Sequence, residues 1–141
     1  MSGLGAGLHC VRGGRIKNVL VIAEKEVIGA CLGEVLREHG YHATVLESYG
    51  GSSGDVQDKE HREYDLIIAT NTSLPPARLK RIIPAIKARH PHARIIVLSG
   101  YCPEDFVAEL KQKGIHGFLP LPYREDILLT TVAGLMAQPV P

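Results

Sequence analysis

The sequence predicts an α/β fold in which a parallel sheet lies between two layers of helices. Short runs of Val, Ile and Leu, typical of strands buried on both faces, recur along the chain. Segments whose apolar residues repeat at helical spacing alternate with these runs. Each helix must pack back over the strands through a right-handed crossover, which makes neighbouring strands parallel. The alternation therefore predicts a flavodoxin-like three-layer sandwich, with five strands in the order 2-1-3-4-5.

Five segments have the composition of strands. The first, third and fourth are almost continuous aliphatic runs (KNVLVIA, DLIIAT and RIIVLS), as expected at the centre of a parallel sheet. The second leads into the glycine- and serine-rich stretch 50–54, which is typical of a loop. The predicted strands are 17–23, 41–46, 65–70, 94–99 and 115–119.

Four segments have a clear helical pattern and one has a weak pattern. Gly40 follows the first of them, at the place where a helix commonly ends. Pro84 falls within another, so we expect it to bend that helix or to lie in its first turns. The weak segment, 55–63, has Val56 as its only aliphatic residue, so we expect a short helix there. The clear helices are predicted at 26–39, 77–89, 103–113 and 124–136.

The length and the ends of the chain predict one domain. With 141 residues, 45% of them hydrophobic, the chain can form a single packed core. Residues 1–15 contain five glycines and only isolated apolar residues, and are predicted to be a flexible tail. We expect the domain to cover 16–137, and 138–141, which contain two prolines, to be a tail or the start of a linker.

The composition argues against several classes of function. Sixteen basic and fifteen acidic side chains give a net charge of +1, so we expect no binding to nucleic acid. No apolar run is long enough to span a membrane. The three cysteines have no metal-binding spacing, and we expect the reducing cytoplasm. We interpret a group of basic residues as a solvated face, although an acidic partner could contact it: Arg78, Lys80, Arg81, Lys87, Arg89 and Arg94.

In a sheet of this kind, ligands bind at the carboxyl ends of the strands, near the reversal in strand order. The corresponding segments are 23–26, 70–73 and 99–102. Ala23 ends the first predicted strand and Glu24 follows it, and Thr70 lies five residues after Asp65. We expect these loops to carry the functional site.

From about Ile16 to Met136 the chain resembles the CheY-like receiver domains of response regulators. In that family a pair of acids after the first strand holds Mg²⁺, and an aspartate after the third strand accepts phosphate. The resemblance places Ala23 and Glu24 at the acid pair. It places Thr70 at the acceptor, or Asn71 if the position is counted back from Pro75. A receiver domain without the acceptor aspartate is therefore expected.

The other family landmarks are partly present. Ser99 with Gly100 matches the hydroxyl and small residues after the fourth strand. Phe118 matches the aromatic residue of the fifth strand, while Leu121 stands where the family has lysine before a proline. Ser99 and Phe118 would then be the pair that relays phosphorylation in receivers. Without the lysine, we expect a drier pocket that is less able to hold an anion.

These replacements remove most of the charges that phosphoryl transfer requires. The reaction needs a carboxylate nucleophile, a divalent cation and a positive group on the phosphate oxygens. Glu24 is the one weak candidate for a metal ligand, but an acid at a helix start also interacts favourably with the helix dipole. A single carboxylate is a poor Mg²⁺ site, so we expect no cofactor and no catalytic residue.

The resemblance implies a signal-transduction module that acts through protein contacts without aspartyl phosphorylation, and not an enzyme. In receivers the dimer or effector face would correspond to 106–136. Tyr101, Phe106 and Tyr123 are candidate anchors for a protein partner or a second copy, because aromatic residues are frequent at interface hot spots.

Two alternatives remain open. In the first, Thr70 or Ser99 is modified, or an anion binds near Ser99, so that an unconventional switch operates. In the second, the sandwich holds a flavin or cobalamin cofactor, as other folds of this architecture do. The segment 24–29 lacks both a glycine-rich phosphate loop and the cobalamin motif, which argues against the second alternative.

Overall fold

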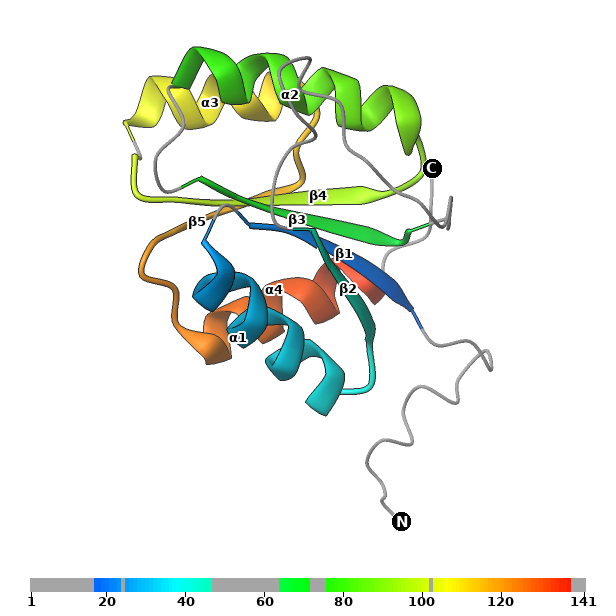
Figure 1. Cartoon of the computed structure of the whole chain (residues 1–141). Coiled ribbons are helices and arrows are strands. Elements are labelled where there is room, and N and C mark those ends of the chain that lie inside the picture. Colours follow the sequence, from blue (N-terminus) through cyan, green and yellow to red (C-terminus); the bar gives the residue numbers. More distant parts are fainter. Residues whose placement is uncertain (1–16, 24, 47–63, 72–75, 102, 138–141) are drawn as a thin grey trace.

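The computed structural model describes residues 17–23, 25–46, 64–71, 76–101 and 103–137, and its core is a five-stranded parallel sheet. The strands have the order β2-β1-β3-β4-β5 (Figure 1), as predicted. Each strand pairs in parallel with its neighbours. The elements are β1 (Asn18–Ile22), α1 (Glu26–Glu38), β2 (His42–Leu46), β3 (Leu66–Asn71), α2 (Pro76–Arg89), β4 (Arg94–Ser99), α3 (Glu104–Gln112), β5 (Gly117–Pro120) and α4 (Glu125–Ala137).

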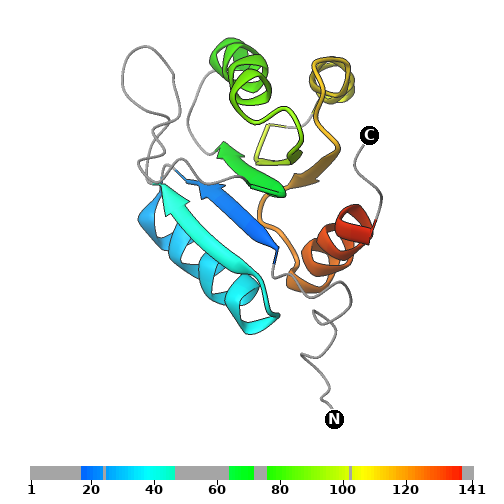
Figure 2. The same ribbon diagram turned by 90° about the vertical axis from the view of Figure 1, so that its right-hand side faces the viewer.

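The helices cover both faces of the sheet, so the domain has three layers. Helices α1 and α4 lie on one face, and α2 and α3 lie on the other (Figures 1 and 2). Successive side chains of a strand point to opposite faces, so each central strand supplies both layers. In β3, for example, Ile67 and Ala69 pack on the α2 and α3 side, while Leu66 and Ile68 pack on the other side.

One core cluster lies between the sheet and helices α2 and α3. Its helical residues are Leu79, Ile82, Ile83 and Ile86 of α2 with Phe106 and Leu110 of α3, all at most 4% exposed. Their spacing of three and four residues places them on one side of each helix. The apolar pattern of the sequence therefore identifies the buried faces of these two helices.

The second core depends on a close approach of α1 to the sheet. A Cβ atom on Gly29 would lie 2.8 Å from Cγ1 of Val45 and 3.1 Å from Cβ of Ala23. Only glycine leaves room for that contact, so the small residue determines how near α1 lies to the strands. Leu32 and Leu36 of α1 then meet Leu128 and Val132 of α4 in one buried cluster.

The predicted boundaries agree with the structure to within one or two residues, and the largest difference is in β5. This strand begins at Gly117 rather than at Ile115. The main-chain N–H of Ile95 is bonded to the ring of His116 instead of to a strand carbonyl, so regular pairing starts one residue later. Pro84 lies in the interior of α2, past its first turns, and its ring is exposed.

Some predictions concern parts of the chain outside the described residues. These are the tail 1–15, the loop 50–54, the weak helix 55–63 and the end 138–141. Within the described ranges, no helix combines the length and the apolar composition that crossing a membrane requires.

Candidate functional site

The strand ends that the sequence singles out lie together at the carboxyl edge of the sheet. Thr70 pairs with Leu98, and Asn71 pairs with Ser99, so the ends of β3 and β4 are level. Leu121, just after β5, donates its N–H to the carbonyl of Ser99 at 2.9 Å. Ala23 follows β1, which lies between β2 and β3. Glu24 and the side chain of Asn71 lie outside the described part of the chain.

Thr70 is completely buried. Its hydroxyl group donates to the carbonyl oxygen of Ile22, at 3.3 Å, and so connects β3 to the end of β1. A buried hydroxyl needs such a partner, because removing it from water without a hydrogen bond is costly. In this structure the threonine therefore acts as a tie between two central strands.

The hydroxyl of Ser99 is also buried and used inside the fold. Its Oγ accepts a hydrogen bond from the N–H of Tyr101 at 3.0 Å and donates one to the carbonyl oxygen of Tyr101 at 3.1 Å. These two bonds hold the start of the loop that leads to α3. A serine in this arrangement stabilises a turn.

An aromatic row extends from this loop into the core. The ring of Phe106 lies edge-on between Tyr101, at a centroid distance of 5.1 Å, and Phe118, at 6.4 Å. Phe106 is only 4% exposed, so the expectation that it anchors a partner is wrong. It shares the inner side of α3 with Leu110, four residues later, and both belong to the core. Tyr101 remains 49% exposed.

The other two positions near this edge pack against the α1 and α4 side. Leu121 and Tyr123 are both half-buried against that core cluster. Burial is the main cause that raises the pKa of the Tyr123 hydroxyl above its usual value, and the nearby groups of Cys31 and Glu125 add to it. Leu121 therefore presents carbon, not an ammonium group, beside the end of β4.

A hollow of about 270 Å³ lies beside Ala23, on the β2 side of the sheet. Lys25, Glu26 and Arg37 bring charges to its rim. The guanidinium of Arg37 donates to the carbonyl oxygen of Ala43 at 2.9 Å, which fixes the side chain against β2. The other lining residues are Ala30 and Val45.

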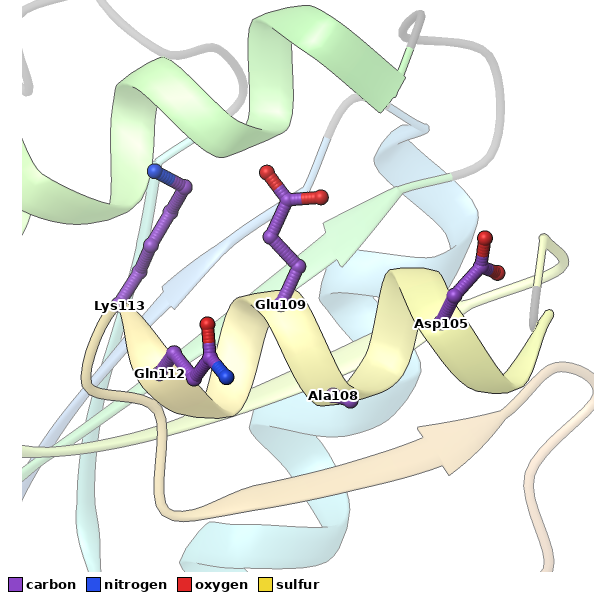
Figure 3. A pocket seen from close by; sticks show the side chains of 5 residues that line it. All are labelled: Asp105, Ala108, Glu109, Gln112 and Lys113. Carbon is purple, nitrogen blue, oxygen red and sulfur yellow. The ribbon is translucent and has the colours of Figure 1, made fainter.

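A shallower hollow of about 540 Å³ lies on α3 (Figure 3), lined by Asp105, Ala108, Glu109, Gln112 and Lys113. In Figure 3 the side chains of Glu109 and Lys113 extend toward α2. Glu109 forms an ion pair with Lys80 at 2.7 Å, so its carboxylate already has a cation. Among the residues that the structure describes, no three His, Cys, Asp or Glu side chains are grouped so that they could hold a metal ion.

The sequence patterns did not single out three residues that the structure makes notable. Val27 of α1 and Ile127 of α4 are 73% and 43% exposed, although both are aliphatic. The sequence does contain a sign that apolar residues of α4 are exposed, because the helix carries no charge from Ile127 to its end. His116, which bonds β4, gave no signal in the sequence pattern.

Comparisons with known proteins support the fold. No family model matches the chain. The fold is similar to a response regulator from Thermotoga maritima, with a TM-score of 0.75 at 18% identity over 88% of this chain and 100% of that one. It is also similar to the chemotaxis protein CheY4 of Vibrio cholerae, with a TM-score of 0.72 at 18% identity over 86% of this chain and 99% of that one.

Two further matches have slightly higher identity. The signal receiver domain of an HD domain-containing protein from Pseudomonas fluorescens Pf-5 has a TM-score of 0.69 at 24% identity, over 86% of this chain and 95% of that one. The sensor kinase CckA of Brucella abortus (strain 2308) is 24% identical over 119 residues. The alignment covers 84% of this chain but only 12% of that kinase. This chain thus has the fold of receiver domains.

Proposed function

We propose that this chain is a receiver-like signalling module that acts through protein contacts and does not use aspartyl phosphorylation. The observation that carries the proposal is the character of the carboxyl edge. The fold resembles that of receivers, but Ala23, Thr70, Ser99 and Leu121 supply no carboxylate or ammonium group there.

The two hydroxyl groups at this edge favour the same conclusion. Thr70 and Ser99 are both 0% exposed, and each forms hydrogen bonds with the backbone of its own domain. Modification of either oxygen requires that it first be exposed, with loss of those bonds. We therefore place the function in the surface of the module and not in a reaction at this edge.

The surface best suited to protein contact surrounds β5, which is the outermost strand on one side of the sheet. A Cβ atom on Gly117 would lie 3.5 Å from Cγ2 of Thr131, so β5 runs beside α4. Ile127 lies one turn before Thr131 on the same side of α4 and is exposed. Tyr101 is exposed on the other side of β5, where its ring contacts Phe106, which in turn contacts Phe118 of β5. We call Tyr101, β5 and Ile127 the β5 face.

Exposed apolar side chains on both sides of an edge strand suit a partner protein or a second copy of this chain. Aromatic residues are frequent at the centres of interfaces, and an edge strand offers unpaired backbone groups. Tyr123 is half-buried, and we expect it to contribute less to the binding energy than Tyr101.

The phosphorylation claim can be tested by intact mass spectrometry. The purified chain is incubated with Mg²⁺ and acetyl phosphate, with a receiver domain that has the acceptor aspartate as a positive control. We expect the mass of this chain to stay unchanged while the control gains a phosphoryl group. An acid-labile phosphoryl group on this chain would contradict the proposal.

The contact claim can be tested with a matched pair of variants. Ile127→Glu places a charge on the β5 face, whereas Val27→Glu places one on an even more exposed aliphatic residue of α1. A partner that co-purifies with the native chain, or the homodimer measured by sedimentation, should be weakened about tenfold or more by the first change. The second change should have little effect. Equal effects of both changes would rule out the β5 face.

A further inference from the structure

The amino end of β5 is tied to β4 by an imidazole ring. The N–H of His116 donates to the carbonyl of Ile95 at 2.7 Å, and the N–H of Ile95 donates to Nδ1 of His116 at 3.1 Å. Regular pairing of the two strands begins one residue later, between Ile96 and Gly117. The histidine side chain therefore occupies the place that a strand carbonyl would take, and it lengthens the ladder by one bond.

This bond requires one particular protonation state. Because the N–H of Ile95 is the donor, Nδ1 of His116 must carry a lone pair, and the ring proton must be on Nε2. A protonated imidazole has donors on both nitrogens and no acceptor. Uptake of a proton therefore replaces an attraction between Ile95 and the ring with a contact between two donors.

The surroundings of the His116 ring also disfavour its protonation. His116 is exposed as a residue, so only partial desolvation of its ring lowers its pKa first, and the positive charges of Lys87 and Arg94 lower it further. Lys87, from α2, crosses the turn before the histidine, and its Nζ would lie 3.2 Å from a Cβ atom on Gly114. Arg94, only 7% exposed, is the residue before Ile95.

The other elements near this end of β5 add no described negative charge beside the ring. Helix α4 meets β5 through Thr131 and Leu135 and carries no charged residue after Asp126. Lys113 is the C-cap residue that follows α3, and the segment between α2 and β4 contains His90 and His92. A proton on His116 would thus join a group of basic side chains.

We propose that His116 is a pH-sensitive latch that holds the amino end of the edge strand β5 to β4 and releases it when the ring is protonated. The latch is a property of the fold itself. Its consequence for signalling, that mild acid loosens one end of the β5 face, rests on the proposed function.

The test is an NMR titration of the ¹⁵N-labelled full chain from about pH 8 to about pH 5, the range in which histidines titrate. We expect the amide signal of Ile95 to shift with the same midpoint as the ring signals of His116. The ring spectrum at neutral pH should show the proton on Nε2. A proton on Nδ1, or an Ile95 signal that ignores the ring titration, would overturn the proposal.

Three variants separate the latch from general effects of acid. His116→Asn offers an amide oxygen near the position of Nδ1 and does not titrate, so the Ile95 signal should be constant. His116→Phe removes the acceptor, and the exchange of the Ile95 amide with solvent should become about tenfold faster or more. If that variant does not fold, the asparagine variant still decides the question. His42→Asn, at an exposed histidine of β2, should leave the Ile95 titration unchanged.

These results involve no partner, so they stand apart from the contact claim. Recovery of a partner or of the dimer is then compared at about pH 7.5 and about pH 6, for the native chain and for His116→Asn. Weaker binding in acid that the asparagine variant abolishes supports the link to the β5 face. Equal binding at both pH values overturns that link and leaves the latch itself intact.

Discussion

The two edges of the sheet use polar side chains in different ways. At the carboxyl edge, the neutral hydroxyls of Thr70 and Ser99 are buried and bond to the backbone. At the amino edge, ionisable side chains bond to the backbone instead. Asp65 accepts from the N–H of Asn18 at 2.8 Å, and His116 accepts from the N–H of Ile95. The buried hydroxyls at the edge where such folds usually bind ligands stabilise the structure, and the hydrogen bonds made by the ionisable side chains Asp65 and His116 lie at the opposite edge.

A charge placed at the carboxyl edge should have the largest effect on the free energy of unfolding. Thr70→Asp would place a carboxylate at a completely buried position. We expect the free energy of unfolding to fall by about 3–5 kcal/mol, as for other buried charges that lack a partner. Urea denaturation near pH 7 measures it. Thr70→Val, which keeps the shape and loses the hydroxyl bond to the carbonyl of Ile22, should cost only about 1 kcal/mol. Equal stability of Thr70→Asp and the native chain would show that the edge tolerates charge.

The stability of the amino edge should depend on the carboxylate of Asp65. Asp65→Ala leaves the N–H of Asn18 without its carboxylate partner, and we expect a loss of about 2 kcal/mol in the free energy of unfolding. Asp65→Asn keeps an oxygen acceptor and should cost less. Thermal or urea unfolding of both variants measures the difference. If the two variants are equally stable, the hydrogen bond to Asn18 is not what holds this edge.

The turn after β4 should depend on one hydroxyl. Ser99→Ala removes both hydrogen bonds to Tyr101, and we expect a loss of about 1 kcal/mol in the free energy of unfolding. Thr130→Ala is the control, because its hydroxyl bonds Asp126 on the exposed surface of α4. That change should be close to neutral in the same urea experiment. A neutral Ser99→Ala would mean that the loop does not need the serine.

The smallest effect should come from pH. The pKa of His116 is lowered in the folded state, so above about pH 6.5 the ring is neutral in both folded and unfolded chains. As the pH falls through that value, unfolded chains bind the proton first, and the folded state loses stability until its own ring is protonated. The native chain should therefore lose stability in mild acid relative to His116→Asn, as measured by urea midpoints. Parallel pH profiles of the two chains would contradict this.

The sequence predicts the fold well because the two periodicities are strong. Strands such as Arg94–Ser99 are continuous aliphatic runs, and the buried residues of α2 repeat at three and four residues. The gathering of Thr70, Ser99 and Leu121 at one edge follows from the rule that parallel strands end together.

The features that were missed depend on contacts between distant segments. The start of β5 is set by a side chain of His116, and no pattern in the sequence reveals that bond. The charge pattern predicts a solvated basic face that includes Arg94, yet this residue is only 7% exposed. Phe106 was assigned to the surface from the family's usual interface, although its spacing from Leu110 already favoured the core.

We infer that the carboxyl edge does not respond to phosphate chemistry. The most direct test is the amide spectrum of the ¹⁵N-labelled chain before and after addition of Mg²⁺ with beryllofluoride, which mimics an aspartyl phosphate. We expect unchanged signals for Thr70, Ser99 and Leu121, because none of these three side chains is a carboxylate nucleophile or carries an ammonium group. Shifts that cluster at these three residues would show a working anion switch and contradict it.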